Sequence, residues 1–449
     1  MGESADKLLS YQSRNNCYDL PYAEIRDLQL TAMNERLQEQ IDRIKLVKHR
    51  AEEEGISEIR SLDDAVPLLL PHTAYKSYPE SFLVQKRFDR LTKWLGTVSS
   101  LPVDTVDLHG VEDMDEWVSR CEQAGLFVAC SSGTTGKPAM LVASQKDLDF
   151  SCKDIVKAVE WGSDIRVGDK RTLTGYGTVA YTPKNTAMGR ALMDAFVDMS
   201  KPKADTGVPP ITIGSITKMI ALRKAIADGT AKPEEITEYD RESRQREESL
   251  ERAVQIAAED VIGKRGDRLY LTGMWGNLFK LAEEVRNRGF SGNDFHPENA
   301  VYLGGGLKRA QLPPDFREYV FETFNLQPRF IYQMYGMQEL GSSMPRCQEG
   351  QRYHIPPWVV CLPLNKNGDE LLPIDRAPVE GRAAFFDLSM DGRWGGVISG
   401  DRVEVDFSPC ACGARTPSVA DTIARYADLE GDDKIGCAGT VDAYVRGMS

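Results

Sequence analysis

Hydrophobic positions recur at helical spacing over three long stretches of the chain. In residues 22–55 the pattern runs without a proline and closes on Gly55, which predicts one long amphipathic helix. Residues 145–161 repeat the pattern. The stretch 232–267 is helical in period but dense in charge, so we expect it to expose most of its surface.

Short apolar runs that end in glycine-rich turns predict strands between these helices. Such runs precede residue 131, reach into "GYG" at 175–177 and precede "GGG" at 304–306. From residue 356 onward short β-like pieces alternate with turns. The order predicts an α/β fold with mixed sheets. We expect an α/β core with an N-terminal helical segment at 1–355, a β-rich subdomain at 356–428, and a hinge with a truncated stub at 429–449.

Composition narrows the classes of partner. The 449 residues are 41% hydrophobic and 27% charged, with a formal net charge of −13, which argues against nucleic acid and anionic membranes as partners. No apolar run of membrane-spanning length and no secretion signal are present. Nine cysteines without such a signal indicate a cytoplasmic protein with reduced thiols, some of them available as metal ligands.

The densest polar motif is "SSGTTGKP" at 131–138, between a predicted strand and a predicted helix. Glycines let backbone N–H groups approach phosphate oxygens, hydroxyls add donors, and the lysine adds a positive charge. A P-loop would need Gly at 131 and Ser or Thr at 138, but this chain has Ser131 and Pro138. The alternative to a phosphate-binding loop is a plain surface turn. The candidate phosphate-binding residues are Ser131, Ser132, Gly133, Thr134, Thr135, Gly136 and Lys137.

The motif "SSGTTGKP" resembles the phosphate loop of the adenylate-forming superfamily. Three further motifs follow it in the order found in that superfamily. "YLGGGLKRA" resembles the glycine turn that passes the adenine, and it implies Gly304, Gly305 and Gly306 there. "YQMYGMQELG" resembles the Tyr-Gly-x-Thr-Glu motif, with Gln338 in place of the threonine.

The resemblance assigns a role to each of these later positions. Tyr335, with Gly336, would pack on the adenine, and Glu339 would hold the Mg²⁺ that bridges the phosphates. Lys137, Gln338 and Glu339 would act in catalysis. In "VISGDRVEV", Asp401 would accept both ribose hydroxyls, since a carboxylate suits two vicinal O–H donors.

Three cysteines and a histidine form a candidate zinc site: Cys347, His354, Cys410 and Cys412. Three thiolates and an imidazole suit structural Zn²⁺ in tetrahedral geometry. The alternative to a zinc site is that these four side chains bind no metal and are simply buried or hydrogen-bonded. Bound zinc would brace Glu339 and Asp401 from behind.

The same set resembles the phenylacetate–CoA ligase branch, with Ala414 inserted in "CACGARTP", and there is some likeness to acyl-protein synthetases. That branch implies an acyl pocket at Tyr176 and Gly177, extended by Trp275. The alternative for Trp275 is a position in the hydrophobic core.

The resemblance implies ATP-dependent activation of a carboxylic acid to an acyl-adenylate, with pyrophosphate released, followed by acyl transfer. Coenzyme A is the favoured acceptor, and an amine, a carrier protein or Cys437 of the chain itself is the alternative. A second alternative is a non-catalytic, zinc-braced nucleotide-binding scaffold.

The family's mobile C-terminal domain follows a hinge, which would lie at Asp432 or Asp433. We expect that domain to be absent or only a stub here, with Lys434 as a candidate for its lysine. A homodimer or a partner subunit stays open.

Overall fold

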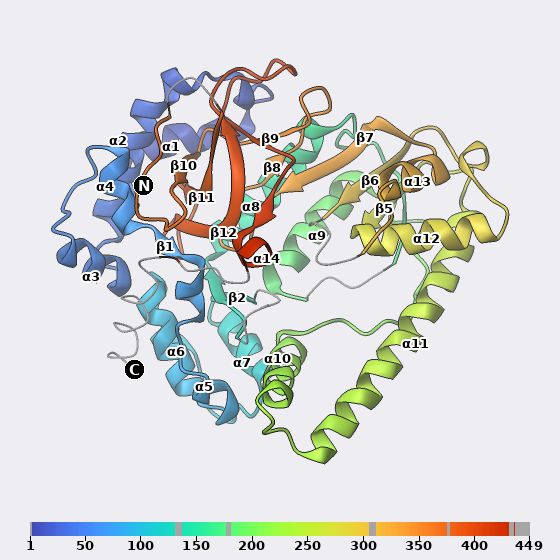
Figure 1. Cartoon of the computed structure of the whole chain (residues 1–449), viewed down its shortest axis with the longest axis horizontal. Helices are drawn as coiled ribbons and strands as arrows, with labels where there is room; N and C mark the ends of the chain where they lie inside the picture. Colours follow the sequence, from blue (N-terminus) through green and yellow to red (C-terminus); the bar gives the residue numbers. More distant parts are fainter. Residues whose placement is uncertain are drawn as a thin grey trace.

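The computed structural model describes residues 2–130, 137–176, 181–304, 311–374, 378–430 and Ile435. Two large β-sheets lie side by side with helices packed around them (Figure 1). This is the mixed α/β arrangement that the order of elements in the sequence predicts.

The five-stranded sheet has the order β4-β5-β6-β7-β8, with β4 to β7 parallel and β8 antiparallel to β7. Alternate residues of a strand face opposite sides. Leu271 and Val301 pack among α11, α12 and α13, while the adjacent Tyr270 and Ala300 pack against α8 and α9. The strands are β4 Thr172–Thr174, β5 Leu269–Gly273, β6 Asn299–Leu303, β7 Leu326–Tyr335 and β8 Met344–Pro345.

The seven-stranded sheet runs β10-β11-β12-β13-β9, and β1 and β14 also pair with β12. Its neighbours are antiparallel except β1, which lies parallel to β12. Two of its strands, β1 and β9, come from before residue 356. The strands are β1 Leu70–Pro71, β9 Arg352–His354, β10 Val359–Leu364, β11 Val379–Asp387, β12 Gly396–Asp406, β13 Ser418–Ala420 and β14 Ala424–Arg425.

The N-terminal helices pack on this second sheet and share its core. The expectation of one helix over 22–55 is wrong, because the chain turns at 41–44 between α2 and α3. Ile44 is fully buried in an extended conformation there, and the buried Gln40 amide donates to the Met390 carbonyl at 3.2 Å. Burial of Ile44 and of the next apolar residues therefore outweighs continuation of the helix. Gly55, at φ +67°, follows α3 as the sequence predicts.

The other helices and a short hairpin complete the fold. Helix α11 carries the charged stretch along one edge of the molecule and buries only small apolar residues near its C-terminal end (Figure 1). The hairpin pairs β2 Phe127–Cys130 with β3 Met140–Ala143. The helices are α1 Glu3–Ser10, α2 Tyr22–Gln40, α3 Lys45–Glu53, α4 Leu62–Ala65, α5 Ser81–Val84, α6 Phe88–Val98, α7 Met114–Gln123, α8 Gln145–Gly162, α9 Pro183–Phe196, α10 Ile213–Ala227, α11 Pro233–Gly263, α12 Trp275–Asn287, α13 Phe316–Thr323 and α14 Tyr426–Glu430.

Within the described residues, no helix has both the length and the apolar character needed to cross a bilayer.

Candidate functional site

The carboxyl ends of four parallel strands define one edge of the five-stranded sheet. Strands β4, β5, β6 and β7 end at Thr174, Gly273, Leu303 and Tyr335, so the residues that follow them gather at this edge. In open α/β sheets ligands bind outside the carboxyl ends of the strands. The described residues Gly175, Gly304 and Gly336, which belong to three of the sequence motifs, follow β4, β6 and β7 at this edge.

Tyr335, the last residue of β7, joins this edge to the second sheet. Its hydroxyl donates to Oδ2 of Asp401 on β12 at 2.8 Å. Burial raises the pKa of Tyr335 well above its ordinary value, so the hydroxyl stays protonated and can donate. The sequence separates these residues by 66 positions, and the fold brings them into contact.

Asp401 is a half-buried carboxylate with the Arg425 guanidinium and the His72 ring among its neighbours. Burial raises its pKa, while the Tyr335 hydrogen bond and the Arg425 guanidinium lower it. Nε of Arg425 lies 3.8 Å from Oδ1 of Asp401, because β14 pairs with β12 in the register Asp401↔Arg425. A ribose could use the carboxylate as an acceptor at this position.

Glu339 is half-buried and lies in the turn between β7 and β8, four residues after Tyr335. Its negative charge raises the pKa of both Asp401 and the buried Tyr75, so the carboxylate lies near both of them. A partly exposed carboxylate beside a second carboxylate suits Mg²⁺, which binds through one or two carboxylates and substrate phosphates. Glu339 therefore fits the metal role that the resemblance assigns to it.

Two buried cations beside Glu339 were missed by the sequence analysis. Lys184 is the second residue of α9, and Arg393 lies in the loop between β11 and β12. Neither belongs to a recognisable motif, and isolated basic residues most often lie on the surface. Their burial at 8% and 2% exposure is the signal, and only the fold provides it.

Lys137 is the one residue of the 131–137 motif within the described part of the chain. Its Nζ donates to the Tyr78 carbonyl at 2.6 Å and lies 5.2 Å from the centre of the Tyr78 ring. The other predicted nucleotide or pocket residues Ser131, Ser132, Gly133, Thr134, Thr135, Gly136, Gly177, Gly305 and Gly306, and also Asp432, Asp433, Lys434 and Cys437, lie outside the described residues.

Tyr176 and Trp275 both belong to the core on the α12 side of the sheet. Trp275 is buried, with the Phe316 ring edge-on to it at 4.9 Å between ring centres and the Phe321 ring tilted against it at 5.7 Å. The core alternative for Trp275 is thus the one that its contacts favour. Gly304, by contrast, is half-exposed at the end of β6.

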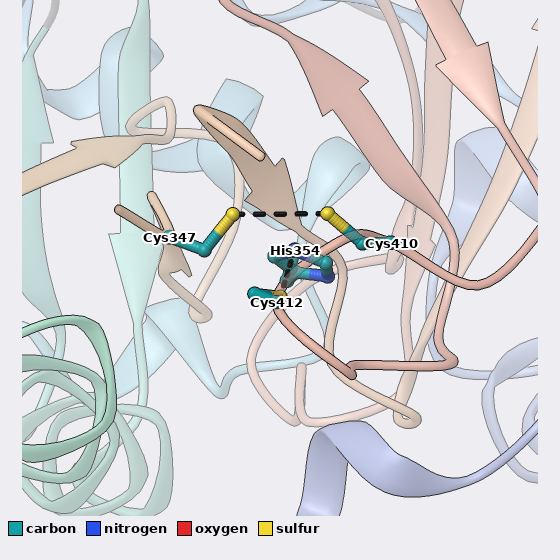
Figure 2. Close-up of side chains that lie close together, drawn as sticks. All are labelled: Cys347, His354, Cys410 and Cys412. Carbon is teal, nitrogen blue, oxygen red and sulfur yellow. Dashed lines mark hydrogen bonds between the residues drawn. The ribbon is translucent and has the colours of Figure 1, made fainter. Parts of the chain in front are cut away.

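The four predicted zinc ligands come together in one cluster (Figure 2). Cys347 lies in the loop between β8 and β9, His354 ends β9, and Cys410 and Cys412 lie in the turn between β12 and β13. Pairing of β9 with β13, in the register His354↔Ser418, brings the two segments side by side. Their ligand atoms all lie within 4.8 Å of one another.

The distances in the cluster fit a tetrahedral zinc site. Sulfur ligands about 2.3 Å from zinc lie about 3.8 Å apart at the tetrahedral angle, and a sulfur and a nitrogen ligand lie about 3.6 Å apart. Cys347 Sγ and Cys410 Sγ are 3.8 Å apart, and Cys412 Sγ and His354 Nε2 are 3.4 Å apart. Burial lowers the pKa of His354 to about 4, so the ring is neutral and can offer a lone pair.

A scan against protein-family models and a search of the curated proteins give no match to the chain. Among solved structures it superposes on 2-hydroxyisobutyryl-CoA ligase in an open conformation in complex with 2-HIB-AMP and CoA. The TM-score is 0.55 at 14% identity, over 92% of this chain and 73% of that one. The same ligase in the postadenylation state with 2-HIB-AMP gives a TM-score of 0.53 at 13% identity, over 91% and 69%.

The fold is that of these CoA ligases. An acyl-CoA synthetase (AMP-forming)/AMP-acid ligase II-like protein from Dyadobacter fermentans superposes with a TM-score of only 0.29 at 13% identity. The mixed α/β architecture predicted from the sequence is confirmed, and it is the fold of 2-hydroxyisobutyryl-CoA ligase.

Proposed function

We propose that the chain activates a carboxylic acid with ATP and then transfers the acyl group to a thiol, with coenzyme A as the acceptor. The observation that carries the proposal is the hydrogen bond from Tyr335 to Asp401 beside Glu339, at the carboxyl edge of the sheet. A ligase of the same fold, 2-hydroxyisobutyryl-CoA ligase, binds 2-HIB-AMP and CoA. The thiol acceptor and the kinship with phenylacetate–CoA ligases are parts of this proposal.

The first step forms a bond from a carboxylate oxygen of the acid to the α-phosphorus of ATP and breaks the bond to pyrophosphate. Such a reaction needs reactants held in line and charge neutralised more than it needs a protein nucleophile. Asp401 would hold the ribose, and Tyr335 would lie against the base. Mg²⁺, when bound at Glu339, would neutralise phosphate charge.

The second step forms a thioester. The sulfur of the acceptor attacks the acyl carbonyl carbon, and AMP leaves with both electrons of the broken C–O bond. The anhydride supplies the free energy, so no oxidant or further cofactor is needed.

Acid-dependent exchange of pyrophosphate into ATP tests the first step without the acceptor. We expect exchange with one class among aromatic, short-chain and long-chain acids. The variant Glu339→Gln should lose about 100-fold or more of it, as expected for a group that stabilises developing charge.

A matched control is Glu380→Gln, on β11, whose carboxylate lies on the surface 2.8 Å from Arg402 Nη2. It should exchange like the wild type. Absence of exchange with every acid, in folded protein that binds ATP, would overturn the proposal and favour the nucleotide-binding scaffold.

We further propose that Cys347, His354, Cys410 and Cys412 hold a structural Zn²⁺. The cluster is closed by four protein ligands and lacks the open position that a catalytic zinc needs. Zinc there would join the β8–β9 loop to the β12–β13 turn, and so would hold the strands that carry Tyr335 and Asp401 in register.

A further inference from the structure

The backbone on both sides of Glu339 accepts hydrogen bonds from buried cations. Nη2 of Arg393 donates to the Gln338 carbonyl at 3.3 Å, and Nζ of Lys184 donates to the Leu340 carbonyl at 2.5 Å. The two donors come from different parts of the chain, the β11–β12 loop and the first turn of α9. The carbonyls that flank Glu339 are thus held from two directions.

Buried carboxylates hold the next part of the same turn. Asp387 accepts from the amides of Gly341 and Ser342 at 2.9 and 3.0 Å. Asp154 on α8 accepts from the Ser343 amide at 2.7 Å. The backbone of Gln338 and of residues 340–343 is therefore bonded to side chains of four separate segments, namely α8, α9, the end of β11 and the β11–β12 loop.

Four ionisable side chains are buried around this turn, and burial of an ionised group is costly unless it is paired and hydrogen-bonded. All four are at most 8% exposed: Lys184, Arg393, Asp387 and Asp154. A hydrogen bond to an ionised group is roughly twice as strong as one between neutral groups, so these side chains hold the turn more firmly than neutral ones would.

Lys184 lies among other charged groups near Glu339. Burial and the Arg393 charge lower the pKa of Lys184 to about 8, while nearby carboxylates, Glu339 among them, act in the opposite direction. The two buried cations lie at the turn that carries Glu339, and their hydrogen bonds fix the backbone on both sides of this residue. A divalent cation binds a carboxylate that is held in a suitable orientation.

We propose that Lys184 and Arg393 are positioning residues, which fix the turn that carries Glu339 and so orient its carboxylate for Mg²⁺. The proposal rests on the metal role of Glu339 in the proposed function. The first turn of α9 also receives the Gln338 amide, which donates to Asn185 Oδ1 at 3.2 Å, so α9 contacts the turn at two points.

The test compares Lys184→Met with Lys184→Arg, and uses Lys157→Met as the control. Lys157 lies on α8, partly exposed and paired with Glu160 at 3.1 Å. Mn²⁺ binding in the presence of ATP, followed by electron paramagnetic resonance, gives a readout independent of turnover. The Mg²⁺ dependence of pyrophosphate exchange gives a second one.

We expect Lys184→Met to weaken Mn²⁺ binding about tenfold or more, as loss of a group that orients a metal ligand does. The half-saturating Mg²⁺ concentration should rise by the same factor, with the KM for the acid unchanged. Lys184→Arg should recover part of the loss, and Lys157→Met should match the wild type.

A folded Lys184→Met protein with wild-type Mn²⁺ affinity would overturn the inference, even if exchange confirms the proposed function. If Lys184→Met does not fold, Arg393→Lys retains the charge but changes the donor geometry, and unchanged Mn²⁺ affinity there overturns it equally. If the wild type binds Mn²⁺ with ATP but exchanges with no acid, the proposed function fails and the Mn²⁺ comparison still decides the inference.

Discussion

Asp154 shows at the residue scale how burial sets the charge of the site. Burial raises its pKa from 3.8 to about 7, although the Ser343 amide that it accepts from pulls the other way. The folded protein therefore holds this proton more tightly than the unfolded chain does. The stabilisation is present in full below about pH 4 and is lost as the pH rises to about 7.

We predict that Asp154→Asn removes this pH dependence. An asparagine can still accept from the Ser343 amide but does not titrate, so the variant should gain in free energy of unfolding, relative to the wild type, as the pH rises from 4 to 8. Urea unfolding of both proteins at several pH values measures the difference. Asp104→Asn, at an exposed position, should show no such trend, and parallel curves for Asp154→Asn and wild type would contradict the prediction.

At the scale of elements, the loop between β8 and β9 passes close to the cysteine cluster at Gly350. A Cβ built on Gly350 would overlap Cys410 Sγ and lie 3.3 Å from Cys347 Sγ. Because backbone here borders the cluster, there is no room for a side chain. We predict that Gly350→Ala disturbs the cluster, lowers zinc content below one equivalent and lowers the melting temperature, as measured by elemental analysis and thermal unfolding.

Gly263, the last residue of α11, is the matched control, since a Cβ there meets no atom within 4 Å. Gly263→Ala should retain zinc and be stabilised by up to about 1 kcal/mol, because alanine loses less conformational freedom than glycine when a helix forms. Full zinc occupancy in Gly350→Ala would refute the assignment of this loop to the metal site.

At the scale of the whole molecule, the cluster joins a loop that follows the five-stranded sheet to a turn of the seven-stranded sheet. A metal bound there would tie the two sheets together, and ligation energy then adds to folding energy. We predict that a zinc chelator lowers the melting temperature by about 5 °C or more and that added Zn²⁺ restores it. Cys412→Ser should start from the lower value and not respond to the chelator, whereas an unchanged wild-type value would argue for buried thiols without metal.

Two helical patterns show which features of the fold could be predicted from the sequence alone. The sequence pattern of α11 is dense in charge, with small apolar residues such as Ala253 and Ala257 near the C-terminal end. That pattern predicts a long, mostly exposed helix, and the buried residues of α11 are these small apolar ones. The 22–55 pattern is equally helical, yet Ile44 is buried where the chain bends. A local pattern reports which residues avoid water, but not where the chain must turn to bury them.

The sequence by itself determined the chemistry that is written in local motifs. The roles of Tyr335, Glu339 and Asp401 were predicted from motifs that resemble those of a known family, and the zinc-ligand set was predicted from its three cysteines and one histidine. Only the tertiary structure placed the Tyr335 hydroxyl 2.8 Å from Asp401 and brought Cys347 to Cys410. Only the tertiary structure shows that Lys184 and Arg393 are buried and donate hydrogen bonds to the turn that carries Glu339. Their role depends on burial and on contacts between distant segments, and neither property is encoded in the residues next to them in the chain.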